Sequence, residues 1–157
     1  MPGLLRRYKF SEDLAAGRSL AGLCLPTLSA AERPGALVPI PLHRQRLRER
    51  GFDQAQCLAK DWGRSLRLPV LSTLLTRVRH TAAQTRLDAE ARRVNLRHAF
   101  SAQGPCPAHV ALVDDVFTTG STAWAAAEAL RDAGAQRVDV WVVARVPLPG
   151  LKEQEAR

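Results

Sequence analysis

The stretch VALVDDVFTTGST, from Val110 to Thr122, decides the fold of this chain. It opens with an apolar run that predicts a buried strand, and it leads into an Ala-rich segment that predicts a helix. A second apolar run, RVDVWVVA at 137–144, predicts another strand. Strand, turn, helix and strand form a βαβ unit, which implies a parallel sheet with helices on both faces. The elements expected here are a strand over 108–113, a turn over 114–120, a helix over 121–133 closed by Gly134, and a strand over 137–144.

The rest of the chain predicts further elements of the same α/β class. Ser11 can cap a helix, and Pro39 and Pro41 deny a strand its central hydrogen bonds beyond about Val38. The length of 157 residues suits one domain with a single core. The elements expected are a helix over 11–24, a short strand over 36–41, a helix over 53–67, a strand over 71–77, an irregular segment over 78–87 and a short helix over 88–98.

Two carboxylates, Asp114 and Asp115, follow the predicted strand directly. In open parallel sheets, ligands bind at the carboxyl ends of the strands. Carboxylates at such an end can accept hydrogen bonds from vicinal hydroxyls or hold a hydrated cation. The pair is therefore a candidate site for a sugar diol.

Four hydroxyl side chains surround a glycine in the turn that comes next: Thr118, Thr119, Gly120, Ser121 and Thr122. The first N–H groups of a helix lack intrahelical partners, and the helix dipole favours an anion there. Gly120 can adopt a positive φ and lets the backbone approach that anion closely. A diol site beside a monophosphate site has the shape of ribose 5-phosphate. The alternative is an ordinary capped turn with two solvated carboxylates. Neither G-x-G-x-x-G nor G-x-x-x-x-G-K-[ST] occurs, so a dinucleotide or an ATP-type loop is not indicated.

The charge of the chain points to a phosphate-bearing partner. Its net charge is +8, and Arg supplies all of the 23 basic residues except Lys9, Lys60 and Lys152. Arg binds phosphate oxygens in bidentate fashion, which favours a nucleotide, a sugar phosphate or nucleic acid. Arg is also a good helix former, so the surplus of Arg does not by itself establish a phosphate-bearing partner.

Several classes of protein are not supported by the sequence. No apolar run approaches 18 residues, so no membrane span is expected, and the N-terminus lacks a secretory signal. We therefore expect a cytoplasmic protein. The three cysteines and four histidines show no metal-ligand spacing, which gives no support to a protein-held zinc site.

The Val110–Thr122 stretch resembles the signature of type I phosphoribosyltransferases, in which apolar residues precede two acidic residues and T-T-G-x-T. Three further stretches resemble the ComF family of competence proteins: YKF at 8–10, VPIPLHRQRLRERGFDQA at 38–55 and RHTAAQTRLDAEARRVNLRHAF at 79–100. The resemblance implies one phosphoribosyltransferase-like domain over 1–157, with its core at 8–146 and a polar tail at 147–157. Members of this family usually begin with a cysteine-rich zinc ribbon. This chain has none, so no zinc is implied.

The resemblance also assigns roles to residues. Asp114 and Asp115 would meet the ribose hydroxyls of 5-phosphoribosyl 1-pyrophosphate (PRPP), and the 118–122 turn would hold its 5-phosphate. Mg²⁺ would arrive with PRPP, without dedicated protein ligands. The residues implied for a pyrophosphate loop are Arg44, Arg46, Arg48, Arg50 and Gly51, and those implied for a flexible hood over 77–98 are Arg79, Thr81, Gln84, Arg92 and Asn95. The alternatives are a solvated basic loop and an exposed helix and loop.

Three functions remain open at the level of sequence. The first is a phosphoribosyltransferase with an unidentified acceptor, and the second is a competence protein that handles single-stranded DNA or binds competence or recombination proteins. The third is a sensor that binds PRPP or a nucleotide without chemistry. Aromatic residues make up only 5 % of the chain, which argues against a dedicated base-stacking surface. A homodimer is compatible with the sequence.

Overall fold

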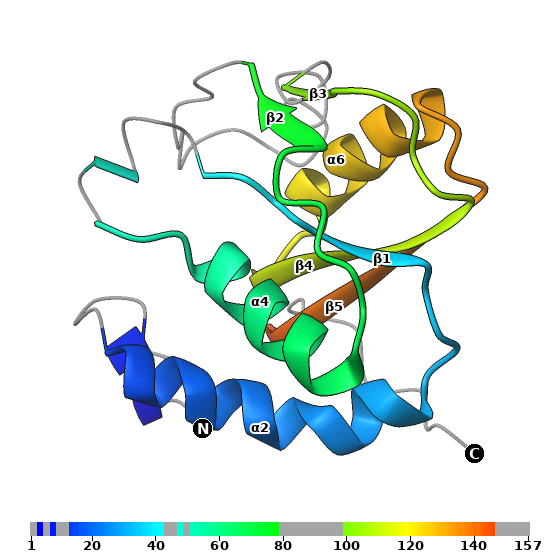
Figure 1. Cartoon of the computed structure of the whole chain (residues 1–157). Coiled ribbons are helices and arrows are strands. Elements are labelled where there is room, and N and C mark those ends of the chain that lie inside the picture. Colours follow the sequence, from blue (N-terminus) through cyan, green and yellow to red (C-terminus); the bar gives the residue numbers. More distant parts are fainter. Residues whose placement is uncertain are drawn as a thin grey trace.

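A computed structural model describes residues 3–4, 7–8, 13–42, 47–48, 51–78 and 99–146. Within these ranges the main sheet has three parallel strands in the order β1-β4-β5 (Figure 1). The strands are Ala36–Pro39, His109–Phe117 and Arg137–Arg145. Helix α6 (Ser121–Asp132) connects β4 to β5, which confirms the predicted βαβ unit.

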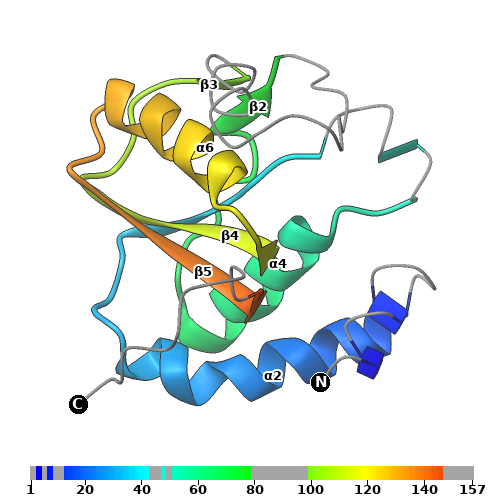
Figure 2. The ribbon, with the colours of Figure 1, turned by 180° about the vertical axis from the view of Figure 1, so that it is seen from behind.

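Helices cover both faces of this sheet (Figures 1 and 2). α6 lies on one face, beside a small antiparallel pair formed by β2 (Leu75–Arg77) and β3 (Phe100–Ala102). α4 (Gln54–Leu66) lies on the other face, and α2 (Leu14–Ala30) packs along α4 and reaches β5. The predicted α/β class, with helices on both faces of a parallel sheet, is therefore confirmed.

The side chains of β4 alternate between two hydrophobic cores. Val110 and Leu112 pack with α6, whereas Ala111 and Val113 pack with α4 and α2. All four are fully buried, as expected for a central strand that is covered on both faces. Both helical layers therefore depend on this one strand.

Trp62 joins three elements in the core on the α4 side. It is fully buried, and its indole N–H donates a hydrogen bond of 3.0 Å to the carbonyl of Ala21 in α2. Its ring meets that of Trp141 in β5 edge-on, with 6.3 Å between the ring centroids. Because the indole donor is satisfied, this large side chain is buried without an unpaired polar group.

The predicted turn at 114–120 begins too early, because β4 continues to Phe117. β5 runs beside it and keeps the pairing going, with Asp114 opposite Val142 and Phe117 opposite Arg145. β1 stops earlier, at Pro39, and the amide of Ile40 still donates a hydrogen bond of 2.9 Å to the carbonyl of Val113 in β4. The carboxylates at 114 and 115 therefore lie within a strand, beyond the point where its other neighbour has ended.

The first predicted helix ends too early as well. α2 begins after Asp13, whose side chain accepts a hydrogen bond from the amide of Ala16, and it continues past Pro26 to Ala30. Pro26 costs one backbone hydrogen bond, but the apolar side chains of Cys24, Leu25 and Leu28 still pack against the core on this face. The free energy gained from this packing outweighs the loss of the one hydrogen bond at Pro26.

The predicted strand at 71–77 is shorter and pairs elsewhere. Only Leu75–Arg77 forms a strand, and its partner is β3, which the sequence did not predict. Val70 makes a single parallel bridge to Leu37 instead. The expected helix at 88–98 lies outside the described residues. No helix in the described ranges is long and apolar enough to cross a membrane.

Two helical glycines provide a test of this packing. A Cβ on Gly63 in α4 would lie 2.4 Å from a methyl of Val70, whereas a Cβ on Gly22 in α2 would meet nothing within 4 Å. Alanine is favoured over glycine in a helix by about 1 kcal/mol. We expect Gly22→Ala to raise the free energy of unfolding by up to about that amount. We expect Gly63→Ala to lower it by about 1–2 kcal/mol, because overpacking outweighs propensity. Urea denaturation measures both, and equal stabilisation by the two variants would contradict the packing described.

Candidate functional site

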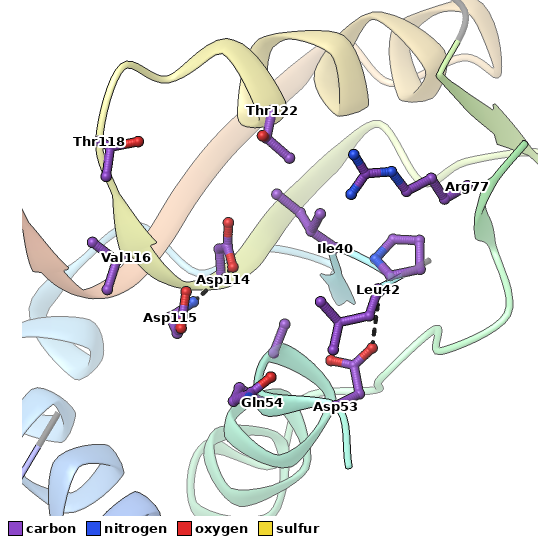
Figure 3. Close-up of a pocket in the computed structure, with 12 residues that line it drawn as sticks. Ile40, Leu42, Asp53, Gln54, Arg77, Asp114, Asp115, Val116, Thr118 and Thr122 are labelled. Carbon is purple, nitrogen blue, oxygen red and sulfur yellow. Dashed lines mark hydrogen bonds between the residues drawn. The ribbon is translucent and has the colours of Figure 1, made fainter. Parts of the chain in front are cut away.

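A pocket of about 260 Å³ opens at the carboxyl ends of β1 and β4 (Figure 3). Four segments line it: residues 40–42 after β1, residues 53–55 at the start of α4, Arg77 at the end of β2, and the corner between β4 and α6. Its polar side chains include three carboxylates, one guanidinium group and two hydroxyls. This is the edge of the sheet where ligands bind in open parallel sheets.

Asp114 and Asp115 enter the pocket from different sides of β4. The alternation that sends Leu112 to α6 and Val113 to α4 also places Asp114 on the α6 side and Asp115 on the α4 side. The amide of Asp115 donates a hydrogen bond of 2.8 Å to the carboxylate of Asp114. Figure 3 shows Asp114 directed towards the turn before α6 and Asp115 on the side of α4. Asp114 therefore lies near the turn before α6, and Asp115 lies near α4.

Asp53 fixes the opposite wall of the pocket. It caps α4, with Oδ1 accepting a hydrogen bond of 3.0 Å from the amide of Gln56. Its Oδ2 accepts a bond of 3.1 Å from the amide of Leu42 (Figure 3). One carboxylate thus ties the segment after β1 to the first turn of α4. The spacing D-x-x-Q of Asp53 and Gln56 resembles a capping box, and this pattern could have indicated from the sequence that a helix begins here.

Gln54 is buried beside this cap. It is only 3 % exposed, and its side-chain Nε2 has no hydrogen-bond partner within the described part of the chain. The hydroxyl of Tyr8 donates a bond of 2.7 Å to its backbone carbonyl. Burial first, and then negative groups that include Asp115, raise the pKa of Tyr8, so the phenol stays protonated and remains a donor. Tyr8 therefore anchors the first turn of α4.

The turn predicted to hold phosphate is divided between two hollows. Thr118 and Thr122 line the pocket, whereas the residues between them line a separate hollow of about 310 Å³ beside Trp124. Gly120 has a φ of 75° and precedes α6 without a side-chain cap. A Cβ on this glycine would lie 2.6 Å from the ring of Phe117. The predicted positive φ is present, and the packing of Phe117 gives a second reason for glycine.

The predicted basic loop lies largely beyond what the structure describes. Arg48 and Gly51 are exposed and do not line the pocket, and Gly51 has a φ of 71°. The other residues of that loop and the hood fall outside the described ranges and stay predictions: Arg44, Arg46, Arg50, Arg79, Thr81, Gln84, Arg92 and Asn95.

Arg77 is a pocket residue that the sequence analysis did not single out, although it begins the segment expected to form the hood. Its guanidinium group extends into the pocket from the end of β2, opposite the carboxylates (Figure 3). Its stem also packs near Phe100, with 5.5 Å from the guanidinium carbon to the ring centroid. No local motif marks it, because its position depends on the β2–β3 pairing. Among the described lining residues, three carboxylates outnumber this single cation.

The chain is similar to proteins named for competence and for the use of DNA. It is 39 % identical over 152 residues to competence protein F of Haemophilus influenzae, and the alignment covers 90 % of this chain. It is 36 % identical over 149 residues to DNA utilization protein YhgH of Escherichia coli O157:H7, again over 90 % of this chain. The chain spans only 66 % of the length of these two relatives. Competence protein ComFC of Bacillus subtilis is 31 % identical over 136 residues, which is 85 % of this chain and 55 % of that protein. No model of a known protein family matches.

Solved structures with lower identity share the fold. Glutamine PRPP amidotransferase of B. subtilis superposes with a TM-score of 0.53 at 22 % identity, over 81 % of this chain and 26 % of that one. UMP synthase of Leishmania donovani gives 0.50 at 17 % identity, over 91 % of this chain and 29 % of that one. The fold is therefore that of the type I phosphoribosyltransferases, as the Val110–Thr122 motif predicted.

The double role of Asp53 can be tested with a second capping aspartate. We expect Asp53→Ala to lower the free energy of unfolding by about 1–2 kcal/mol, because a helix cap is lost. The amide of Leu42 should also exchange its hydrogen faster, because its acceptor is removed. Asp13→Ala removes the cap of α2 but should leave the Leu42 amide protected. Hydrogen exchange measures both variants, and unchanged protection of Leu42 in Asp53→Ala would contradict the link.

Proposed function

Because the chain belongs to the ComF family of competence proteins, we propose that it binds PRPP in the pocket at the end of β4. We propose further that it transfers the phosphoribosyl group to an unidentified acceptor and releases pyrophosphate. The observation that carries this proposal is the position of Asp114 and Asp115 near the end of β4, in the same pocket as two threonines of the turn that leads into α6.

The hydroxyls and the phosphate of a phosphorylated ribose would each meet complementary groups at the end of β4. The carboxylates can accept hydrogen bonds from the sugar hydroxyls. Thr118 and Thr122 line the same pocket and can donate to phosphate oxygens. Gly120 provides no side-chain cap for α6, so the helix dipole and the amides of Thr122 and Ala123 can face an anion, whereas the amide of Ser121 donates a long hydrogen bond of 3.5 Å to the Thr119 hydroxyl. The pocket volume of about 260 Å³ suits part of a PRPP molecule.

The charge of the pocket favours a ligand that brings its own cation. Among the described lining residues, three carboxylates and one guanidinium group do not favour a bare pyrophosphate. Within the described residues, no three acidic, cysteine or histidine side chains converge to form a metal site. The oxygen-rich pair Asp114 and Asp115 suits contact with Mg²⁺ that is already bound to PRPP. When bound, this ion would neutralise charge on the departing pyrophosphate.

The proposed reaction exchanges one bond at C1 of the ribose for another. The C1–oxygen bond to pyrophosphate breaks with its electron pair on oxygen, and a lone pair of the acceptor forms the new bond to C1. The sugar gains oxocarbenium character between the two events. Asp115 is placed to orient the hydroxyls, and the Arg77 guanidinium group can stabilise charge on the departing oxygens.

Binding can be tested directly by calorimetry with PRPP and Mg²⁺. We expect the double variant Asp114→Asn with Asp115→Asn to lose at least about 100-fold in affinity, because two charge-assisted hydrogen-bond acceptors are removed. Asp132→Asn, at the exposed end of α6, is the matched control and should bind as the wild type does. Circular dichroism should show the fold intact in both. Equal affinity in the double variant and the control would contradict the role of the carboxylate pair in binding PRPP.

A pyrophosphate-release assay with a panel of nucleobases and amines then separates enzyme from sensor. Binding accompanied by pyrophosphate release supports a transferase. Binding without release for any acceptor supports a protein that senses PRPP or a nucleotide. Either result leaves the site assignment intact, because both need the ligand in the same pocket.

A second candidate function is the handling of single-stranded DNA together with other competence or recombination proteins. The names of the relatives and the net charge of +8 favour it. We expect binding to single-stranded DNA to weaken steeply as salt rises and to show little base preference, since phosphate contacts would dominate. Fluorescence anisotropy at 50 and 200 mM salt would measure about a 10-fold loss or more. Tight binding that persists at high salt would instead indicate dedicated base readout.

A further inference from the structure

The aromatic side chains on the α4 side of the sheet belong to the core and not to the pocket. Tyr8 and Phe52 pack together with 5.7 Å between their ring centroids, and Trp62 and Trp141 do so with 6.3 Å. Both pairs are part of the hydrophobic cluster between the sheet and the two helices on this face. These rings therefore stabilise the fold and leave the lining of the pocket to other side chains.

The remaining described rings lie outside the pocket as well. Phe117 and Trp124 line the separate hollow beside the 118–122 turn. Phe100 is 5 % exposed, and its ring lies under the guanidinium group of Arg77. With the exception of Phe10, which is outside the described ranges, every aromatic side chain of the sequence is thus placed away from the pocket lining. Proteins commonly hold nucleobases by stacking them on aromatic rings, and the described lining offers no such ring.

The volume of the pocket also favours a small acceptor. About 260 Å³ lies below the roughly 300–1,000 Å³ of sites that enclose drug-sized ligands. A phosphorylated ribose at the end of β4 would take up much of this space. An acceptor with one nitrogen and few carbons fits the remainder better than a planar ring system does.

The charge of the wall opposite β4 narrows the chemistry of the acceptor further. Asp53 lines this wall, and its two oxygens accept hydrogen bonds from the amides of Leu42 and Gln56 (Figure 3). These bonds fix the carboxylate in position, and its oxygens keep further lone pairs for a ligand. The proposed contacts with ribose use the carboxylates of β4, so Asp53 is the negative group that faces an acceptor. A fixed negative charge attracts a protonated amine and stabilises the positive charge that develops on an attacking nitrogen.

We propose that the acceptor of the phosphoribosyl group is ammonia or a small primary amine, held beside Asp53, and not a nucleobase. This inference rests on the proposed binding of PRPP in the same pocket. The lone pair of the neutral amine forms the new bond to C1 of the ribose, and the C1–oxygen bond breaks with its electron pair on pyrophosphate. The nitrogen then loses one proton to solvent. The products are a phosphoribosylamine, pyrophosphate and a proton.

The first test measures pyrophosphate release by the full chain with PRPP and Mg²⁺. Its probes are ammonium chloride and methylamine on one side, and adenine, guanine and uracil on the other. We expect release with both amines and none above background with the nucleobases, the background being that of Asp114→Asn with Asp115→Asn. At a fixed total concentration of amine, the rate should rise up to about tenfold per pH unit below an amine pKa near about 10, because the neutral fraction rises in that proportion.

The second test changes the charge of the wall and keeps the helix cap. Asn caps a helix about as well as Asp, so Asp53→Asn removes the negative charge with little effect on the start of α4. It should raise the KM for the amine about 3- to 10-fold. The KM for PRPP should stay the same or fall, because the loss of a negative charge does not weaken the binding of an anion. Asp13→Asn, at the cap of α2 outside the pocket, is the matched control and should change neither KM.

The outcomes separate this inference from the proposed function on which it rests. A rise of both KM values in Asp53→Asn would indicate a structural defect and overturn the role of Asp53. Release with a nucleobase and not with amines, or binding of PRPP without release for any acceptor, would overturn the amine acceptor and leave PRPP binding intact. Failure of the wild-type chain to bind PRPP in calorimetry would overturn the proposed function itself.

Discussion

The unequal lengths of the two strands beside β4 are the constraint on which the site depends. β1 stops pairing at Pro39, whereas β5 continues beside β4 to Arg145. The last residues of β4 are therefore held straight by one neighbour and left open on the side where the other has ended. The pocket occupies that opening, and both carboxylates reach it from a rigid strand. A site built on a strand holds its groups more precisely than one built on a loop.

The wall opposite β4 is held by hydrogen bonds that meet at the first turn of α4. Asp53 joins that turn to the amide of Leu42, and the Tyr8 hydroxyl joins it to the N-terminal part of the chain. Tyr8 also packs against Gly17 of α2, where a Cβ would lie 2.4 Å from its ring. Segments far apart in the sequence thus fix one edge of the pocket. Tyr8 therefore supports the site although it is not among the described residues that line the pocket.

Sequence reasoning succeeded where a local pattern determines the structure. The motif from Val110 to Thr122 and the strand pattern after it predicted the βαβ unit, the type I phosphoribosyltransferase fold and the positive φ at Gly120, since each follows from neighbouring residues. It failed where tertiary packing decides. Packing against the core allows α2 to continue beyond Pro26, and pairing with β5 extends β4 to include Asp114 and Asp115. Gln54 and Arg77 were not singled out for the same reason, because only the folded chain brings them beside the motif.

The central claim is that the end of β4, the start of α6 and the start of α4 contact one phosphorylated ribose. Nuclear magnetic resonance of the isotope-labelled chain during titration with ribose 5-phosphate and Mg²⁺ tests it at the level of single groups. The account predicts that the largest shifts fall on the amides of Ala55, Asp115, Thr122 and Ala123. Exposed amides at the far end of α6, such as that of Asp132, should not move. Shifts confined to other surfaces, or none at saturating ligand, would contradict the account.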